Sequence, residues 1–202
     1  RVMAADCGEV EREKTRATFE ARCREAGVSG QLAFAEGEPV ARIVERARWA
    51  DMVICNLAYP EEEGEPATLA ANVRPLLRRS PRPLLALPGV VTPLQRPLLA
   101  FDGGPRSETA LFAAVYAAVK WGLKPVVLSV AELGRSAAEP LERARAMFER
   151  YGAVADYVPA DGPVAEAICR VADERGCDLI LMGSYKYSRW LEDVFGGVLE
   201  QV

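Results

Sequence analysis

The chain has 202 residues, of which 50% are hydrophobic and 27% are charged, and its formal net charge is −4. That apolar content is enough to build a packed core, so a disordered chain is excluded. No histidine is present. Its absence removes Ser-His-Asp and Cys-His catalysis together with histidine-ligated zinc. The function classes that remain favour binding over catalysis.

Charge and hydropathy also argue against nucleic-acid and membrane partners. The nearest approach to a basic patch is Arg74, Arg78 and Arg79, which fits the solvated side of a helix better than a phosphate-binding surface. The most apolar stretches, 84–91 and 97–101, are broken by proline and fall far short of the ~20 residues that a spanning helix needs. Five cysteines without a CxxC pair indicate a reduced, cytoplasmic protein.

The first half of the chain alternates strand and helix patterns. A helix is expected near 11–26, ending at Gly27, and a second begins at Pro39, since proline favours the first helical turn. Asp51 opens an unbroken apolar run that suits a central strand buried on both faces. The other expected elements are strands at 2–5, 32–34 and 84–87 and a helix at 68–79.

The second half repeats this order after a proline-rich linker. It opens with a strand at 97–101 and the turn Asp102-Gly103-Gly104, after which Ser107 is expected to cap a helix running to Gly122. The expected buried side of that helix holds Ala110, Ala113, Ala114, Ala117 and Trp121. Further expected elements are strands at 125–130, at 157–158 and at 178–182, and helices at 139–151 and from Pro163.

The two halves resemble each other at a nearly fixed offset. The segment from Gly27 to Asn56 matches the segment from Gly152 to Gly183 in pattern. Strands that alternate with helices predict right-handed βαβ crossovers and a parallel sheet. The predicted fold class is therefore α/β, with two tandem open parallel-sheet (Rossmann-like) domains at 1–92 and 93–202. We expect the first to lack its N-terminal part and the second its C-terminal part.

A glycine-containing loop after the last strand is the richest candidate site. Gly183 follows the strand and lets a ligand approach the backbone, while Gly196 and Gly197 open a predicted helix whose free N–H groups favour phosphate. Asp102, at the carboxyl end of another strand, could accept a hydrogen bond from the amine of an adenine. The alternative is that these glycines only end elements and that Asp102 only begins a turn.

These residues resemble the universal stress protein family. Its ATP-binding members carry the pattern Gly-x2-Gly-x9-Gly-Ser after a strand of the type Asp-Leu-Ile-Val-Met, and the strand 178–182 with Gly183 and Gly196 is similar to it. The family also has an Asp-Gly-Ser turn after its first strand, similar to Asp102-Gly103-Gly104. The resemblance covers essentially the whole chain and implies an adenine-nucleotide hydrolase-like fold in each domain.

The resemblance implies a set of nucleotide-binding residues in the second domain. Asp102 and backbone groups at Val130 would hold the adenine, and Ala100 and Met182 would line the base pocket. The ribose and phosphates would lie on Gly183, Lys186, Gly196, Gly197 and Val198. The implied ligand is ATP or another adenine nucleotide, with magnesium, and family members usually form homodimers. No metal-binding side chains and no catalytic residue are expected.

Two residues depart from the family pattern. Lys186 occupies the second glycine position, at a cost of ~1 kcal/mol if the loop needs a positive φ there. Gly197 replaces the Ser and removes a hydroxyl worth ~0.5–1.5 kcal/mol, although its backbone N–H remains. In the first domain Asn56 and Tyr59 stand at the corresponding positions, and the acidic segment 60–65 would repel phosphate. We expect weakened nucleotide binding in the second domain and none in the first.

Three function classes follow from this pattern. The favoured one is a regulatory ATP-binding module of the stress response, without enzymatic activity. The second is a family member that has lost its ligand and acts as a dimerising interaction module, which Lys186 and Gly197 would support. The third, an adenylating enzyme of a related fold, needs Ser-Gly-Gly-x-Asp-Ser after the first strand, and the segment 101–107 lacks its first Ser and its Asp.

Overall fold

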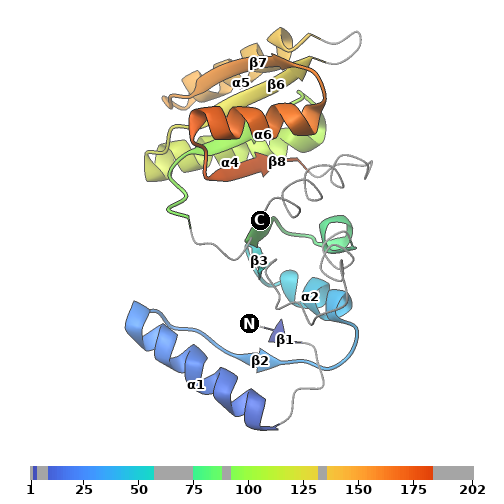
Figure 1. Ribbon diagram of the computed structural model, residues 1–202, viewed down its shortest axis with the longest axis vertical. Helices are drawn as coiled ribbons and strands as arrows, with labels where there is room; N and C mark the ends of the chain where they lie inside the picture. The colour runs from blue at the N-terminus through green and yellow to red at the C-terminus, as the bar shows by residue number, and fades with distance from the viewer. Residues whose placement is uncertain (1, 4–8, 57–74, 88–91, 132–135, 184–202) are drawn as a thin grey trace. The chain divides into compact units, whose positions relative to one another are not determined.

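The computed structural model describes residues 2–3, 9–56, 75–87, 92–131 and 136–183 (Figure 1). The chain divides into two compact units, Arg1–Val90 and Val91–Val202. The division lies two residues before the boundary expected at 92. The α/β class with parallel sheets is confirmed.

The first unit contains two separate pairs of parallel strands among its described residues. β1 pairs with β2, and β3 pairs with β4 in the register Val53↔Leu84 to Asn56↔Leu87. Helix α2 begins at Pro39 as predicted, and the carboxylate of Glu38 accepts hydrogen bonds from the N–H groups of Val40 and Ala41. The elements are β1 (Val2–Met3), α1 (Glu9–Ala26), β2 (Ala33–Phe34), α2 (Pro39–Ala47), β3 (Val53–Asn56), a helical stretch at 75–79 and β4 (Leu84–Leu87).

The second unit is built on one four-stranded parallel sheet in the order β7-β6-β5-β8. The first strand of the unit, β5, therefore lies in the interior of the sheet, and the chain moves outward from it in both directions. The elements are β5 (Pro97–Ala100), α4 (Pro105–Trp121), β6 (Val126–Ala131), α5 (Ala138–Arg150), β7 (Asp156–Asp161), α6 (Val164–Arg175) and β8 (Leu179–Met182).

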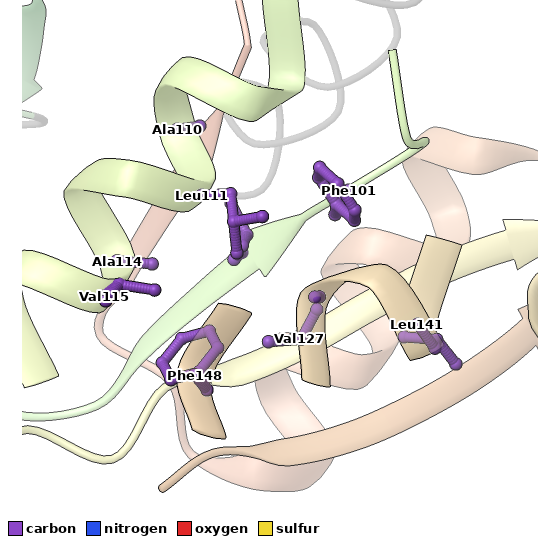
Figure 2. Close-up of a cluster of buried hydrophobic side chains, with 10 residues drawn as sticks. Phe101, Ala110, Leu111, Ala114, Val115, Val127, Leu141 and Phe148 are labelled. Carbon is purple, nitrogen blue, oxygen red and sulfur yellow. The ribbon is translucent and has the colours of Figure 1, made fainter. Parts of the chain in front are cut away.

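Hydrophobic clusters cover both faces of this sheet. On one face α4 and α5 pack over Leu99 and Val127 of the sheet. Figure 2 labels Val127 and the fully buried Phe148, which belongs to α5. On the other face α6 packs Ile168 and Val171 over Leu98, Val126 and Leu128. Successive residues of β5 thus enter opposite clusters, which is why its sequence reads as a continuous apolar run instead of an alternating one.

Three local predictions are wrong in detail. Helix α4 begins at Pro105 with Gly104 at the N-cap, so Ser107 lies within its first turn and does not cap it. Trp121 is 67% exposed and Ala113 is also exposed, whereas Leu111 and Val115 are buried. The strand after Asp51 is not buried on both faces, because Ile54 is 61% exposed.

The carboxylate of Asp178 joins the start of β8 to the segment that leads into β5. Its two oxygens accept hydrogen bonds of 2.8 Å each from the backbone N–H groups of Gln95 and Arg96. The N–H of Asp178 donates to the carbonyl of Arg96, and Thr92 Oγ1 donates to the carbonyl of Asp178. This clasp fixes the alignment of the interior strand β5 with the edge strand β8.

We expect Asp178→Ala to lower the opening free energy of the β5 amides by about 2 kcal/mol, because two backbone donors lose a charged acceptor. Hydrogen exchange of the Leu98 and Leu99 amides measures this loss within the second unit. Asp51→Ala is the matched control, since Asp51 holds the equivalent position in the repeat and is exposed. It should cost less than about 0.5 kcal/mol, and an equal loss in both variants would contradict the clasp.

Candidate functional site

Three of the predicted base-pocket residues share one face of the sheet at its carboxyl edge. Ala100 lies directly beside Met182 in the pairing of β5 with β8, and Val130 is near the end of β6 on the other side of β5. Ala100 and Val130 pack against the cluster beneath α6. Met182 follows Leu181, which packs on the opposite face, so the alternation of the strand directs Met182 to the α6 face. Residues from three strands therefore form one apolar shelf.

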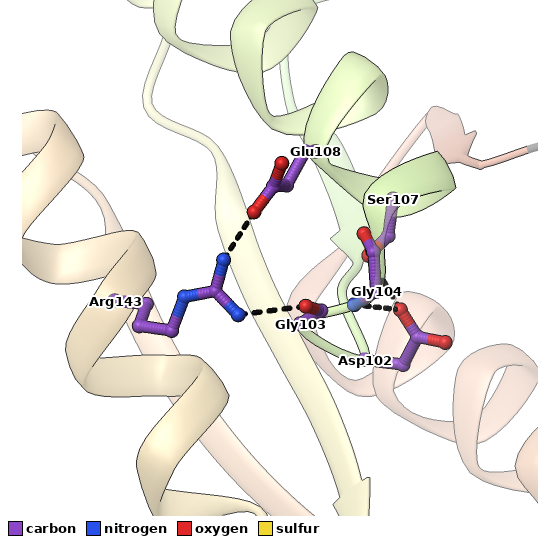
Figure 3. Close-up of polar contacts among 6 residues, drawn as sticks. All are labelled: Asp102, Gly103, Gly104, Ser107, Glu108 and Arg143. Carbon is purple, nitrogen blue, oxygen red and sulfur yellow. Dashed lines mark hydrogen bonds and ion pairs between the residues drawn. The ribbon is translucent and has the colours of Figure 1, made fainter.

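The turn that follows β5 is organised by Asp102. Its Oδ1 accepts hydrogen bonds from the Gly104 N–H at 2.8 Å and from Ser107 Oγ at 2.5 Å (Figure 3). Ser107 is buried and also contacts the carbonyl of Gly104 at 3.0 Å. Gly103 has φ +73°, a backbone conformation that favours glycine. Asp102 therefore stabilises the turn through hydrogen bonds within it.

Gly183 is required by packing. A Cβ built on it would lie 2.6 Å from the carbonyl carbon and oxygen of Arg106 and from the nitrogen of Ser107. All three are backbone atoms of the first turn of α4, so no flexible side chain can move aside. The structural reason for this glycine is the close passage of the chain leaving β8 across the start of α4.

The remaining predicted site residues lie outside the described part of the chain. These are Lys186, Gly196, Gly197 and Val198, and in the first unit Tyr59 and the acidic segment 60–65. Asn56 ends β3. The predictions on these residues stay predictions.

No pattern in the sequence predicted the contact that Arg143 makes with the Asp102 turn. The guanidinium of Arg143, on α5, donates from Nη1 to the carbonyl of Gly103 at 2.7 Å and pairs through Nη2 with the carboxylate of Glu108 on α4. Arg143 lies forty residues from Gly103 in the chain. Only the packing of α5 beside α4 brings the two together, and no local motif signals it.

Three cysteine side chains are half-buried, and burial raises the pKa of the Cys55 and Cys169 thiols. Burial also raises the pKa of Cys177, against the opposing effect of the Arg96 guanidinium. A raised pKa favours the thiol over the thiolate, which is the stronger nucleophile. Within the described ranges there is also no group of three or more acidic or Cys side chains that could hold a metal ion.

A cavity of about 400 Å³ lies elsewhere, between α5 and the end of β7. Arg145 and Tyr157 line it, with the guanidinium carbon of Arg145 4.3 Å from the centre of the Tyr157 ring. Among the predicted nucleotide-binding residues that the structure describes (Ala100, Asp102, Val130, Met182 and Gly183), none borders this cavity. We therefore place the candidate site on the apolar shelf and the Asp102 turn.

No helix in the described part of the chain is both long and apolar enough to cross a membrane.

We expect Gly183→Ala to destabilise the second unit by about 3 kcal/mol, because the added methyl group meets fixed backbone atoms. Gly176→Ala is the control. Gly176 has φ +60° and open space around its Cβ position, so that variant carries only the backbone cost of about 1 kcal/mol. Hydrogen exchange of the Val127 amide reports both losses. If Gly183→Ala costs no more than Gly176→Ala, the close approach is not as described.

Comparison with known proteins agrees with this fold. Residues 134–202 match the universal stress protein family. A curated universal stress protein of Synechocystis is 27% identical over 139 residues, which are 66% of this chain and 47% of the relative. The chain thus spans about half the length of that curated relative.

Solved structures show the same architecture. A universal stress protein from Archaeoglobus fulgidus has a TM-score of 0.73 at 20% identity, covering 96% of this chain and 73% of that one. A putative universal stress protein from Pseudomonas aeruginosa has a TM-score of 0.64 at 18% identity, covering 90% of this chain and 69% of that one. At these identities the likeness establishes the fold alone. The sequence matches make the chain similar to universal stress proteins, over residues 134–202 for the family and over 139 residues for the curated relative.

Proposed function

We propose that the second unit binds an adenine nucleotide, ATP with magnesium, and acts as a regulatory module of the stress response. The observation that carries the proposal is the shared position of Ala100, Val130 and Met182. They lie far apart in the sequence, yet they occupy one face at the carboxyl edge of neighbouring strands. Ligands of open α/β sheets bind outside this edge.

The chemistry of the shelf suits a purine base. Apolar side chains cover one side of the base, and the Asp102 carboxylate, one residue beyond the end of the β5–β6 pairing, offers an acceptor for its exocyclic amine. Lys186, Gly196, Gly197 and Val198 would supply a cation and backbone N–H groups to the ribose and phosphates, as their likeness to the family pattern implies.

A regulatory role fits the side chains better than an enzymatic one. The chain has no histidine to act as a general base, and burial raises the pKa of the half-buried thiols described above. We therefore propose that nucleotide binding, without turnover, is the activity. A cytoplasmic homodimer is part of this proposal, and sedimentation equilibrium of the purified chain tests its assembly.

A second candidate function is an interaction module without ligand. It is favoured by the structural tasks of two expected ligand-binding residues. Asp102 Oδ1 already accepts two hydrogen bonds within its own turn, and Gly183 is required by the start of α4. Both residues would be retained in a member that binds nothing.

We expect titration of ATP and magnesium into the chain to show one micromolar site, and Asp102→Ala to weaken it at least about tenfold. The physical reason is the loss of a charged acceptor and of the turn that presents it. Asp161→Ala is the matched control, because Asp161 ends the edge strand β7 of the same sheet and is exposed. Calorimetry measures each affinity, and thermal unfolding checks that each variant folds. Equal affinities in both variants would exclude the Asp102 turn as the site.

Restoring the family pattern separates the two candidates. If the unaltered chain gives no heat at millimolar ATP, the double variant Lys186→Gly, Gly197→Ser is titrated next. Binding gained by this variant would identify a former nucleotide site that the two departures have closed. Binding absent from both proteins would favour the interaction module.

A further inference from the structure

A single side chain from another helix holds the turn at the candidate site. Arg143 extends from α5 and donates from Nη1 to the carbonyl of Gly103 at 2.7 Å, while Nη2 pairs with Glu108 on α4 (Figure 3). One guanidinium thus joins α5, α4 and the loop that follows β5. The peptide that Arg143 contacts joins Gly103 to Gly104, and its N–H donates to Oδ1 of Asp102.

The contact is close enough to fix the position of the turn. A Cβ on Gly103 would lie 3.3 Å from Arg143 Nη1 and 3.4 Å from Cγ of Pro140, so the first turns of α5 pack directly on this peptide. The hydrogen bonds among Asp102, Gly104 and Ser107 span at most five residues and shape the turn internally. Arg143 adds a bond from forty residues away, which orients the turn relative to the rest of the unit.

Both contacts of Arg143 depend on the shape of its side chain. A guanidinium is a planar fork that can address two acceptors at once, whereas an ammonium is a compact charge on a flexible stem. The side chains of Arg143 and Glu108 are 48% and 42% exposed. An ion pair in such contact with water contributes little stability by itself. The ion pair between Nη2 and Glu108 therefore orients the guanidinium so that Nη1 can donate to the carbonyl of Gly103.

We propose that Arg143 is a positioning residue for nucleotide binding, acting through the carbonyl of Gly103 on the placement of Asp102. This inference rests on the proposed function of the second unit. Without the Arg143 contact, the left-handed Gly103 peptide can rotate and carry the Asp102 carboxylate away from the apolar shelf. A binding site loses affinity when the geometry of its polar groups is no longer fixed in advance.

The test compares Arg143→Met with Arg143→Lys and with Arg150→Met. Arg150 is an exposed residue at the end of the same helix, so its replacement controls for the loss of one positive charge from α5. The first readout needs no ligand and is the exchange rate of the Gly104 amide, which donates to Asp102. We expect Arg143→Met to raise that rate about tenfold while the Val127 amide in β6 is unchanged. The second readout is ATP affinity, expected to fall about tenfold in Arg143→Met, with part of the loss recovered in Arg143→Lys.

The outcomes separate this inference from the proposed function. ATP binding of equal affinity in Arg143→Met and the unaltered chain would overturn the positioning role and leave the proposed function standing. A uniform rise in exchange at Gly104 and Val127 would show a general loss of stability and would also overturn it. If the unaltered chain binds no ATP, the proposed function and the binding role of Arg143 fail together.

Discussion

The second unit depends on the burial of one strand, β5, on both of its faces. Leu98 and Leu99 are both completely buried, one beneath α6 and the other beneath α4 and α5. A strand with this constraint needs a partner on each side and a helix layer on each face. Once both are in place, the carboxyl edge is where a ligand can reach the loops after β5 and β8. The position of the candidate site therefore follows from the burial of β5 between its two neighbouring strands and the two helix layers.

The equivalent strands of the first unit are less buried. β1, β2 and β3 correspond through the repeat to β6, β7 and β8, yet the described strands form two separate pairs, and Ile54 in β3 is largely exposed. The sequence repeat predicted equal elements in the two halves. It could not predict unequal burial, because burial depends on neighbouring strands and not on the pattern of one segment.

The sequence predicted which segments form helices and strands better than it predicted which side of each element is buried. The α/β alternation, the parallel sheet and the helix ends at Gly27 and Gly152 follow from strong local signals, and both glycines adopt positive φ. The prediction of the buried side of helix α4 was right for Ala110, Ala114 and Ala117 and wrong for Ala113 and Trp121. The error arose because the helix is apolar on nearly every side. Phe112 and Tyr116 are exposed while Ala114 is buried, so the residue types carry little contrast. Pro105 was the overlooked signal for the true start of α4.

The contact of Arg143 with Gly103 bears directly on the departures at Lys186 and Gly197. Those two changes would together remove about 1.5–2.5 kcal/mol from a nucleotide complex. Ordering a single residue of a loose turn on binding costs a similar amount, about 1–2 kcal/mol. The turn is already ordered in the folded chain by the hydrogen bonds of Asp102, Ser107 and Arg143. The entropy cost of ordering it is therefore part of the folding free energy and does not reduce the binding free energy. A prearranged Asp102 turn can therefore compensate for an imperfect phosphate loop, which makes retained nucleotide affinity physically reasonable in this chain.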